Sequence, residues 1–356
     1  MTFNEVIKYT ENLLPLVTKL YELEDYDIKL INPHEGGRNV VYNCEKEGTG
    51  AKIIRISFLN DRTLKDMMGE VEYIRYLFRH GGSVSNVISS MNGKLVEEIS
   101  YEEHTFFISL FEKAKGKMLV ENNYKYREGV PINEYYYNCG KILGKLHQLS
   151  KSYTPVYRRY GFFDKYNSEY INRIIPDSLS LLKEKLVELL ITLEEVDRNN
   201  ESYGMVHFDY NDGNYMIDFD TGNITVYDFD NSCICWYMFD LASIWSNGLG
   251  WIQFEPDVLK RKKFMEDYFN IALEGYKSET KLDNSMLDKL PLFIQVNLME
   301  NIVDSFEVMR NNGEELEINE ELSYLIKCIE EDIPYKGFFH DIYTCENPFE
   351  YEERNI

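Results

Sequence analysis

The sequence lacks the marks of a secreted, membrane-spanning or disulfide-stabilised protein. Its six cysteines are scattered over 356 residues without a C-x-x-C pair, so we expect reduced thiols rather than a disulfide framework or a zinc site. The N-terminus, "MTFNEVIKYTENLLPLV", has neither the basic start nor the apolar run of a signal peptide. No stretch approaches the roughly 18 apolar residues that a membrane span needs. The chain is therefore expected in the cytoplasm, with no membrane partner.

Positive charge is also scarce. Lys and Arg number 38 against 61 Asp and Glu, which gives a formal net charge of −23. This balance argues against a nucleic-acid partner, because phosphate binding depends on clustered basic side chains. Residues 311–356 hold 13 acids and 3 bases, so a net charge of −10 lies in this segment. Two interpretations stay open: a solubilising surface, or attraction of a cationic substrate.

Apolar residues, by contrast, are plentiful. Hydrophobic residues make up 44% and aromatic residues 14% of the chain, so it can fill buried cores and is not globally disordered. Its length fits one two-lobed domain or two ordinary domains. No internal repeat is present.

Residues up to about 111 have the pattern of a sheet accompanied by two helices. Helical spacing of apolar residues covers 3–21, with a kink expected at Pro15, and again 64–81, where a glycine ends the helix. Short β-rich segments separated by Gly, Asn and Asp turns supply the strands: "YDIKLIN", "RNVVYNCE", "AKIIRISF", "GKLVEEIS" and "HTFFISLF".

After "EKAKGKML" the pattern becomes mainly helical. Two short strands, "NYMIDF" and "NITVYDF", interrupt it and are joined by the hairpin turn Asp220-Thr221-Gly222. The spacing of Cys233 and Cys235 suits one face of a strand or loop. An α+β fold is predicted, with a β-rich N-terminal lobe, a mainly helical C-terminal lobe and a ligand cleft between them. The predicted helices cover 132–151, 178–198, 236–248, 256–276 and 284–311.

One polar segment carries residues suited to phosphoryl transfer. In "GMVHFDYNDGNYMIDF", His207, Asp209 and Asn214 follow the pattern H-x-D-x(4)-N, and a second acidic segment, residues 228–230, follows the hairpin. Such a pattern by itself also suits a polar turn that leads into a strand. Phosphoryl transfer needs an oriented acceptor hydroxyl and a metal ion to neutralise charge, and carboxylate and amide oxygens are suitable ligands for Mg²⁺.

These motifs resemble those of the aminoglycoside phosphotransferase and choline kinase superfamily, over most of residues 30–245, and imply a two-lobed protein kinase-like fold. The resemblance implies that Asp209 orients or deprotonates the acceptor hydroxyl, while Asn214 and Asp228 hold Mg²⁺. The implied supporting residues are His207, which braces the loop, Asp230, which assists the metal or caps its loop, and Asp240, which supports the catalytic loop from a helix.

The resemblance extends to the nucleotide-binding residues. In "GGRNVVY", Gly36 and Gly37 match a nucleotide loop, although Gly-Gly is also common in plain turns. In "KIIRIS", Arg55 matches the basic residue that contacts the ATP phosphates. Glu70 matches its helix partner, with Glu72 a near alternative on the same helix.

A hinge is implied at residues 112–116, between an N-terminal lobe of 1–111 and a C-terminal lobe of 117–356. Phe111 is expected near the adenine pocket, where ordinary core is the alternative. Backbone groups of Glu112 and Ala114 are expected to contact adenine. In "CGKILGKLHQL", His147 is expected to pack rather than to catalyse.

Phe208 departs from the pattern, because the family commonly has glycine between the histidine and the aspartate. The chain is thus expected to be a kinase that uses Mg²⁺ and ATP or GTP to phosphorylate a hydroxyl of a small molecule. A cationic amine and an aminoglycoside are the candidate acceptors. A catalytically retired binding or structural protein, similar to spore-coat relatives, and a protein Ser/Thr kinase remain alternatives. The aromatic residues Trp236, Tyr237, Trp245 and Trp251 suit either an amine cage or buried core.

Overall fold

The computed structural model describes residues 3–335 apart from 32–37, 59–61, 252–256 and 313–316. The fold is α+β and consists of two compact units. The first unit comprises residues up to 115 together with 153–159 and 225–230, and the second comprises the remainder. These two short segments join the first unit, whereas the sequence pattern assigned them to the C-terminal lobe.

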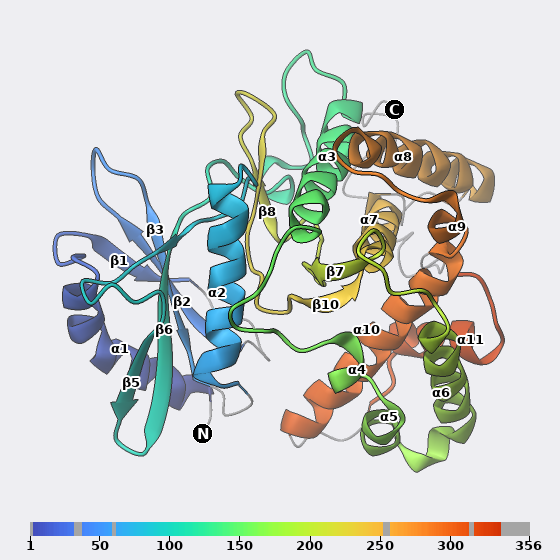
Figure 1. The fold of residues 1–356 in the computed structure, drawn as a ribbon, viewed down its shortest axis with the longest axis horizontal. Helices are drawn as coiled ribbons and strands as arrows, with labels where there is room; N and C mark the ends of the chain where they lie inside the picture. Colours follow the sequence, from blue (N-terminus) through green and yellow to red (C-terminus); the bar gives the residue numbers. More distant parts are fainter. Residues whose placement is uncertain (1–2, 32–37, 59–61, 252–256, 313–316, 336–356) are drawn as a thin grey trace. The chain divides into compact units, whose positions relative to one another are not determined.

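An antiparallel sheet forms the centre of the first unit (Figure 1). The strand order is β1-β2-β3-β6-β4, and β5 also pairs with β6. The five segments predicted from sequence form β1, β2, β3, β5 and β6, while the two-residue strand β4 was not predicted. The strands are β1 (Asp27–Leu30), β2 (Asn39–Glu45), β3 (Lys52–Ser57), β4 (Val87–Ile88), β5 (Glu97–Tyr101) and β6 (His104–Glu112).

The two faces of strand β3 point into different surroundings. Ile54 and Ile56 join the buried apolar cluster to which helix α1 (Phe3–Leu20) contributes, and α1 continues through Pro15. Arg55 lies between them in sequence and hydrogen-bonds instead to helix α2 (Leu64–Arg79). Strand alternation therefore presents one charged side chain to α2 while its neighbours fill the core. Helix α2 starts at a capping box of Thr63 and Asp66, and Gly81 just beyond it has a φ of +84°.

The second unit is mainly helical (Figure 1). The predicted helix 284–311 is divided into α9 and α10, and α11 was not predicted. Strand β7 pairs with β10, which carries Cys233 and Cys235, and β8 pairs with β9 as the predicted hairpin. The elements that follow β6 in the chain are η1 (Val120–Asn122), α3 (Asn133–Ser150), α4 (Phe162–Lys165), α5 (Ser168–Ile174), η2 (Asp177–Leu179), α6 (Ser180–Glu194), β7 (Tyr203–Val206), β8 (Tyr215–Ile217), β9 (Ile224–Val226), β10 (Cys233–Trp236), α7 (Tyr237–Trp251), α8 (Val258–Glu279), α9 (Asn284–Leu287), α10 (Leu290–Asn312) and α11 (Glu320–Glu330). Of these, β9 lies mostly in the segment 225–230 of the first unit.

Helices α3 and α8 pack at unusually close range. A Cβ atom on Gly140 of α3 would collide with the carbonyl of Ala272, and one on Gly275 of α8 would collide with the carbonyl of Tyr137. Glycine at both positions lets the two backbones approach. The helix that carries His147 is therefore fixed by backbone contact with α8 as well as by side-chain packing.

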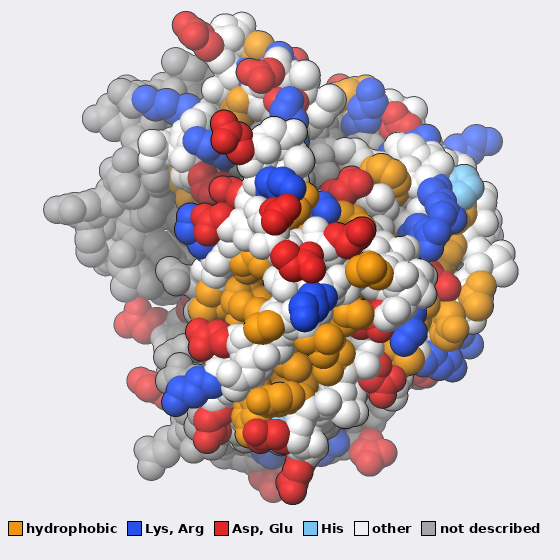
Figure 2. Space-filling view, turned by 90° about the vertical axis from the view of Figure 1, so that its left-hand side faces the viewer, with side chains coloured by type: hydrophobic (Ala, Val, Ile, Leu, Met, Phe, Trp, Pro, Cys, Tyr) orange, Lys and Arg blue, Asp and Glu red, His pale blue; other side chains and the backbone are white. Residues whose placement is uncertain are grey.

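Charges of both signs are interspersed with apolar side chains on the face shown in Figure 2. Within the described part of the chain, no helix combines the length and apolar composition needed to cross a bilayer.

Candidate active site

A buried carboxylate holds the loop that follows β7 in the second unit. Asp240 of α7 is fully buried, and its Oδ2 accepts the backbone N–H of His207 at 2.8 Å. Its Oδ1 accepts the backbone N–H of Phe208 at 2.9 Å. The ring of His207 is also buried, and its Nδ1 lies 3.3 Å from the backbone nitrogen of Asp209. Asp240 and His207 thus fix the backbone on either side of Phe208.

His147 completes the surroundings of this carboxylate. Its Nε2 lies 3.0 Å from Asp240 Oδ2, and its Nδ1 lies 2.9 Å from the Tyr276 hydroxyl. Burial lowers the pKa of His147, and the hydrogen bond to Asp240 only partly opposes this shift. A neutral, buried ring between two partners fits the packing role predicted for His147.

Phe208 adopts a backbone conformation that normally favours glycine. Its φ is +71°, in the left-handed region where a Cβ atom is strained. Its side chain is buried and stacks on Phe239, with ring centroids 4.1 Å apart and planes at 2°. It also stacks on Tyr166 at 5.9 Å. The left-handed φ explains why glycine suits this position, and the aromatic packing offsets the strain of phenylalanine.

Two asparagines orient the carboxylate of Asp209. Asn214 Nδ2 donates to Asp209 Oδ2 at 3.0 Å and to the Asp209 carbonyl at 2.8 Å. Asn211 Nδ2 donates to Asp209 Oδ1 at 2.6 Å. Asn211 was not identified from the sequence, although its position two residues after Asp209 is typical of a side chain that bonds back within a turn. Each carboxylate oxygen of Asp209 therefore accepts a hydrogen bond from an asparagine, which fixes the orientation of the carboxylate.

Glu300 of α10 is a further acidic group, and its pKa responds to the charge of Asp209 in this loop. Burial raises the pKa of Glu300 to about 8, together with the negative charge of Asp304. The charge of Asp209 acts in the same direction, while Lys165 opposes it. The Tyr166 hydroxyl donates to Glu300 Oε1 at 3.4 Å. No motif or periodic pattern identified Glu300, because it lies 91 positions after Asp209 on another element.

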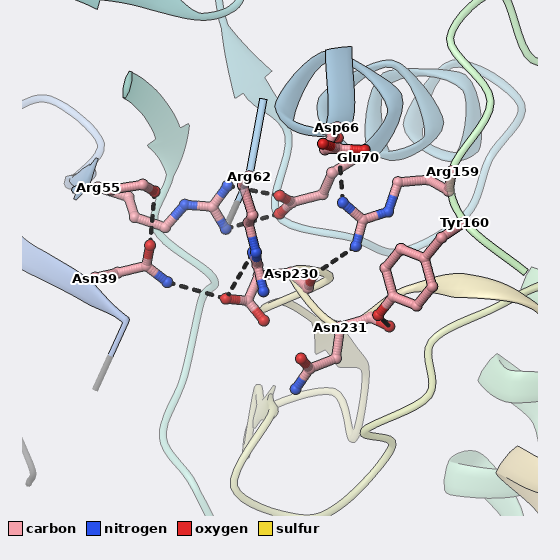
Figure 3. Close-up of polar contacts among 10 residues, drawn as sticks. Asn39, Arg55, Arg62, Asp66, Glu70, Arg159, Tyr160, Asp230 and Asn231 are labelled. Carbon is pink, nitrogen blue, oxygen red and sulfur yellow. Dashed lines mark hydrogen bonds and ion pairs between the residues drawn. The ribbon is translucent and has the colours of Figure 1, made fainter. Parts of the chain in front are cut away.

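A buried ion pair joins β3 to α2 in the first unit (Figure 3). Arg55 Nη1 and Nη2 donate to Glu70 Oε1 and Oε2 at 2.7 and 2.8 Å, and the two residues are 6% and 0% exposed. Burial opposes the charge on Arg55, but the carboxylate of Glu70 outweighs it and raises the arginine pKa. Glu70, rather than Glu72, is thus the partner of Arg55. The guanidinium also lies 5.0 Å from the ring centroid of Phe111, which is buried beside it.

The acidic segment after β9 also belongs to the first unit. Asp228 has a φ of +60° and contributes, with Asp230, to the raised pKa of Arg55, so both carboxylates lie within electrostatic reach of it. Phe229 is buried and contacts the ring of Tyr73 of α2, with centroids 5.9 Å apart. Phe229 therefore packs against α2, and the two acidic residues Asp228 and Asp230 flank it in the sequence.

Asp230 is held by side chains that the sequence did not single out (Figure 3). Its Oδ2 accepts from Arg62 Nη1 and from Asn39 Nδ2, each at 3.1 Å. Burial alone would raise its pKa, but Arg62, followed by Arg55 and Arg38, lowers the pKa of Asp230 to about 2. Asp230 thus has a supporting position, with its charge neutralised by arginine.

The proposed hinge contacts have mixed outcomes. The backbone N–H of Glu112 donates to the Asn86 carbonyl at 2.8 Å, so this donor is already engaged. Its carbonyl accepts from Ser85 and retains a second lone pair. Ala114 is buried, and its backbone makes no hydrogen bond to another described residue. Gly36 and Gly37 lie outside the described residues.

The aromatic residues after the acidic segment favour the core interpretation. Trp236 is fully buried, and its Nε1 donates to the Asp197 carbonyl at 3.0 Å. Tyr237 is 2% exposed. Trp245 is half-buried, and the side chain of Trp251 lies outside the described ones. Trp236 and Tyr237 are therefore core residues and do not line an amine cage.

Amide and carboxylate oxygens, the ligand types that hard divalent cations prefer, are present among the candidate residues. Among the described residues, no three His, Cys, Asp or Glu side chains form a metal site. Asn214 uses its Nδ2 on Asp209, so its amide oxygen is the atom left for a ligand. Amide and carboxylate oxygens are the ligand types that Mg²⁺ uses when phosphates and water supply the remaining positions.

Comparisons with known proteins identify the family and the fold of this chain. A family model described as a phosphotransferase enzyme family matches residues 30–275. The chain is 28% identical over 265 residues to an amicoumacin kinase of Bacillus subtilis, which covers 73% of this chain and 75% of that protein. A solved amicoumacin kinase in complex with AMP-PNP, Ca²⁺ and Ami has a TM-score of 0.79 at 24% identity, covering 99% of both chains. A microcompartment-associated aminopropanol kinase has a TM-score of 0.67 at 18% identity, covering 93% of this chain and 99% of that one. The structural likenesses confirm the predicted kinase-like fold.

The left-handed backbone at Phe208 can be tested by paired substitutions. Phe208→Ala and Phe208→Gly both remove the aromatic packing, which we expect to cost about 3–5 kcal/mol of unfolding free energy. Glycine also relieves the backbone strain, so Phe208→Gly should be more stable than Phe208→Ala by about 1 kcal/mol. Denaturant unfolding of both variants measures the difference. Greater stability of the alanine variant would contradict the left-handed conformation.

The raised pKa of Glu300 predicts a pH-dependent stability. Burial raises the pKa of Glu300 to about 8 in the folded state, whereas an ordinary glutamate titrates near 4.5. Between these values the folded state binds more protons than the unfolded state, so this group makes stability fall as pH rises. Glu300→Gln mimics the protonated form and should therefore gain Tm relative to wild type as pH rises through this window.

The matched control for this pH series is Glu274→Gln, which removes an exposed carboxylate from α8 of the same unit. Its Tm difference from wild type should stay flat where that of Glu300→Gln grows. A flat difference for Glu300→Gln as well would show that Glu300 is ionised in the folded protein at neutral pH.

Proposed function

The chain belongs to the phosphotransferase enzyme family and is a kinase acting on hydroxyl groups, and from this premise we propose its donor, metal and acceptor roles. The donor is ATP or GTP, used with Mg²⁺, and the acceptor is a small molecule. The observation that carries the proposal is the loop held by Asp240, on which two asparagines fix both carboxylate oxygens of Asp209. Such preorganisation suits a reaction in which positioning supplies most of the catalysis.

Asp209 is proposed as the residue that contacts the acceptor. Its oriented carboxylate would accept the hydrogen bond of the attacking hydroxyl and take its proton as the bond to the γ-phosphorus forms. The amide donors of Asn211 and Asn214 hold this carboxylate in one orientation. The backbone N–H bonds to Asp240 keep this geometry from relaxing.

Separate residues are proposed to bind the metal, the phosphates and the adenine of the donor. Asn214 and Asp228 would hold Mg²⁺, which when bound neutralises charge on the nucleotide phosphates. Arg55, oriented by Glu70, would contact the phosphates, and the unbonded backbone of Ala114 would contact adenine. The buried position of Phe111 against Arg55 supports a role as a wall of this region rather than an exposed contact. A contact of adenine with Glu112 would use its carbonyl.

The proposed acceptor carries an ammonium group. Burial, with the negative charges of Asp304 and Asp209, raises the pKa of Glu300 against the opposing charge of Lys165, so further positive charge nearby would stabilise its ionised form. An ammonium group next to the reacting hydroxyl would supply that charge. The relative named amicoumacin kinase supports a small-molecule acceptor. The described cysteines are all free and buried, which fits a reducing, cytoplasmic location.

The proposed roles of Asp209 and Asp228 predict losses that differ in kind. Asp209→Asn should leave the affinity for Mg-ATP near that of wild type but lower turnover by about 10²- to 10⁴-fold, because only the proton acceptor is lost. Asp228→Asn should weaken both Mg-ATP binding and turnover, because a metal ligand is lost. Calorimetric titration of Mg-ATP and the rate of slow ATP hydrolysis measure the two effects without knowledge of the acceptor.

Asp220→Asn is the matched control, since it removes an exposed carboxylate from the nearby hairpin turn. It should leave binding and turnover unchanged. Equal nucleotide affinity in the Asp209 and Asp228 variants, or unchanged turnover in Asp209→Asn, would contradict the assigned roles. Absence of Mg-ATP and Mg-GTP binding to wild type would favour a retired binding protein.

A further inference from the structure

Asp230 and Arg62 form an ion pair in the first unit that none of the proposed reaction steps uses. The two side chains are 9% and 13% exposed, and Arg62 Nη1 donates to Asp230 Oδ2 at 3.1 Å. The same oxygen accepts from Asn39, whose own Oδ1 accepts the Ser57 hydroxyl at 2.6 Å. The carboxylate is thus fixed from β2 and β3 on one side and neutralised by arginine on the other (Figure 3).

The backbone of Asp230 is fixed independently of this pair. Arg159 is 2% exposed, and its Nη2 donates to the Asp230 carbonyl at 2.6 Å. Its Nη1 donates to the carbonyl of Asp66 in the first turn of α2 at 3.1 Å. The acidic segment therefore keeps its place on α2 without Arg62. A second arginine is not required to hold the loop, so the Arg62 contact needs another explanation.

The two arginines nearest this segment differ in how fully their donors are used. Both terminal nitrogens of Arg55 are committed to Glu70 in a nearly dry site. Arg62 makes one side-chain hydrogen bond to a described residue, although a guanidinium has five donors. Arg55 and Arg62 both act electrostatically on the single carboxylate of Asp230. Among the described contacts, Arg62 therefore has terminal donors available, whereas the unbonded donor of Arg55 is its buried Nε.

We propose that Arg62 binds a terminal phosphate of the nucleotide donor, and that Asp230 holds its guanidinium in place until the nucleotide arrives. The inference rests on the proposed function. Phosphate oxygens accept the same charge-assisted, planar hydrogen bonds as a carboxylate, so the guanidinium can exchange one anion for the other or bridge both. Arg62 and Arg55 both act on the carboxylate of Asp230. A phosphate that contacts Arg55 would therefore bring negative charge close to Arg62 as well.

A nucleotide series separates phosphate binding from a structural role. Arg62→Ala should weaken Mg-ATP binding by about 10- to 100-fold, as expected for a lost charge-assisted contact, and Mg-ADP binding less. The affinity for adenosine, which has no phosphate, should remain within about twofold of wild type, because no contact to it is removed. Calorimetric titration of the full chain with each ligand measures these ratios.

Three further variants complete the comparison. Arg62→Lys keeps the charge but loses the planar fork, so its ATP affinity should lie between those of wild type and Arg62→Ala. Asp230→Asn keeps Arg62 and should lose less ATP affinity than Arg62→Ala. Arg79→Ala removes an exposed arginine from the end of α2 and should match wild type with all three ligands.

The outcomes distinguish this inference from the proposed function. If wild type binds no nucleotide, both are overturned. If wild type binds ATP and Arg62→Ala binds ATP equally well, or loses ATP and adenosine affinity in equal proportion, only the role of Arg62 is overturned. If Arg62→Ala fails to fold, the ATP-to-adenosine ratio of Arg62→Lys decides, and a ratio equal to that of wild type overturns the inference.

Discussion

The acceptance of two backbone N–H groups by the buried carboxylate of Asp240 is the interaction on which the candidate active site depends. A fully buried carboxylate without partners would be strongly unfavourable, and here His207, Phe208 and His147 supply its donors. Because two of these donors are the backbone N–H groups of the consecutive residues His207 and Phe208, satisfying the charge also fixes the loop. The left-handed backbone at Phe208 and the orientation of Asp209 follow from that constraint.

The first unit uses the same principle with the charges reversed. There a buried arginine, Arg55, projects from a strand whose neighbouring residues fill the core, and Glu70 of α2 satisfies it with two parallel hydrogen bonds. Around Asp230, Arg62 donates to the carboxylate and Arg159 donates to the backbone carbonyl. In both units, buried charges fix the residues proposed to act on the nucleotide or the acceptor. The site is therefore positioned by electrostatics as much as by packing.

Local patterns in the sequence predicted much of this arrangement. Strand alternation and helical spacing located the sheet and most of the helices, because those signals depend on neighbouring residues. The family resemblance, rather than periodicity, indicated the Arg55–Glu70 pair. The contacts made by Arg62 and Arg159 with Asp230 span 168 and 71 positions, and no local pattern encodes them. Glu300 was missed for the same reason. The left-handed φ at Phe208 was also hidden, because a bulky aromatic gives no local signal for a conformation that favours glycine.

The central claim is that the charge of Asp240, through two backbone hydrogen bonds, holds the loop that carries Asp209. Hydrogen exchange resolved to single residues, compared between wild type and Asp240→Asn, tests it most directly. An asparagine offers one acceptor oxygen in place of two, so at least one of the two bonds must be lost. The account predicts faster exchange at the amides of His207 and Phe208, with protection in α3 and α8 retained. Unchanged protection of both amides would contradict it.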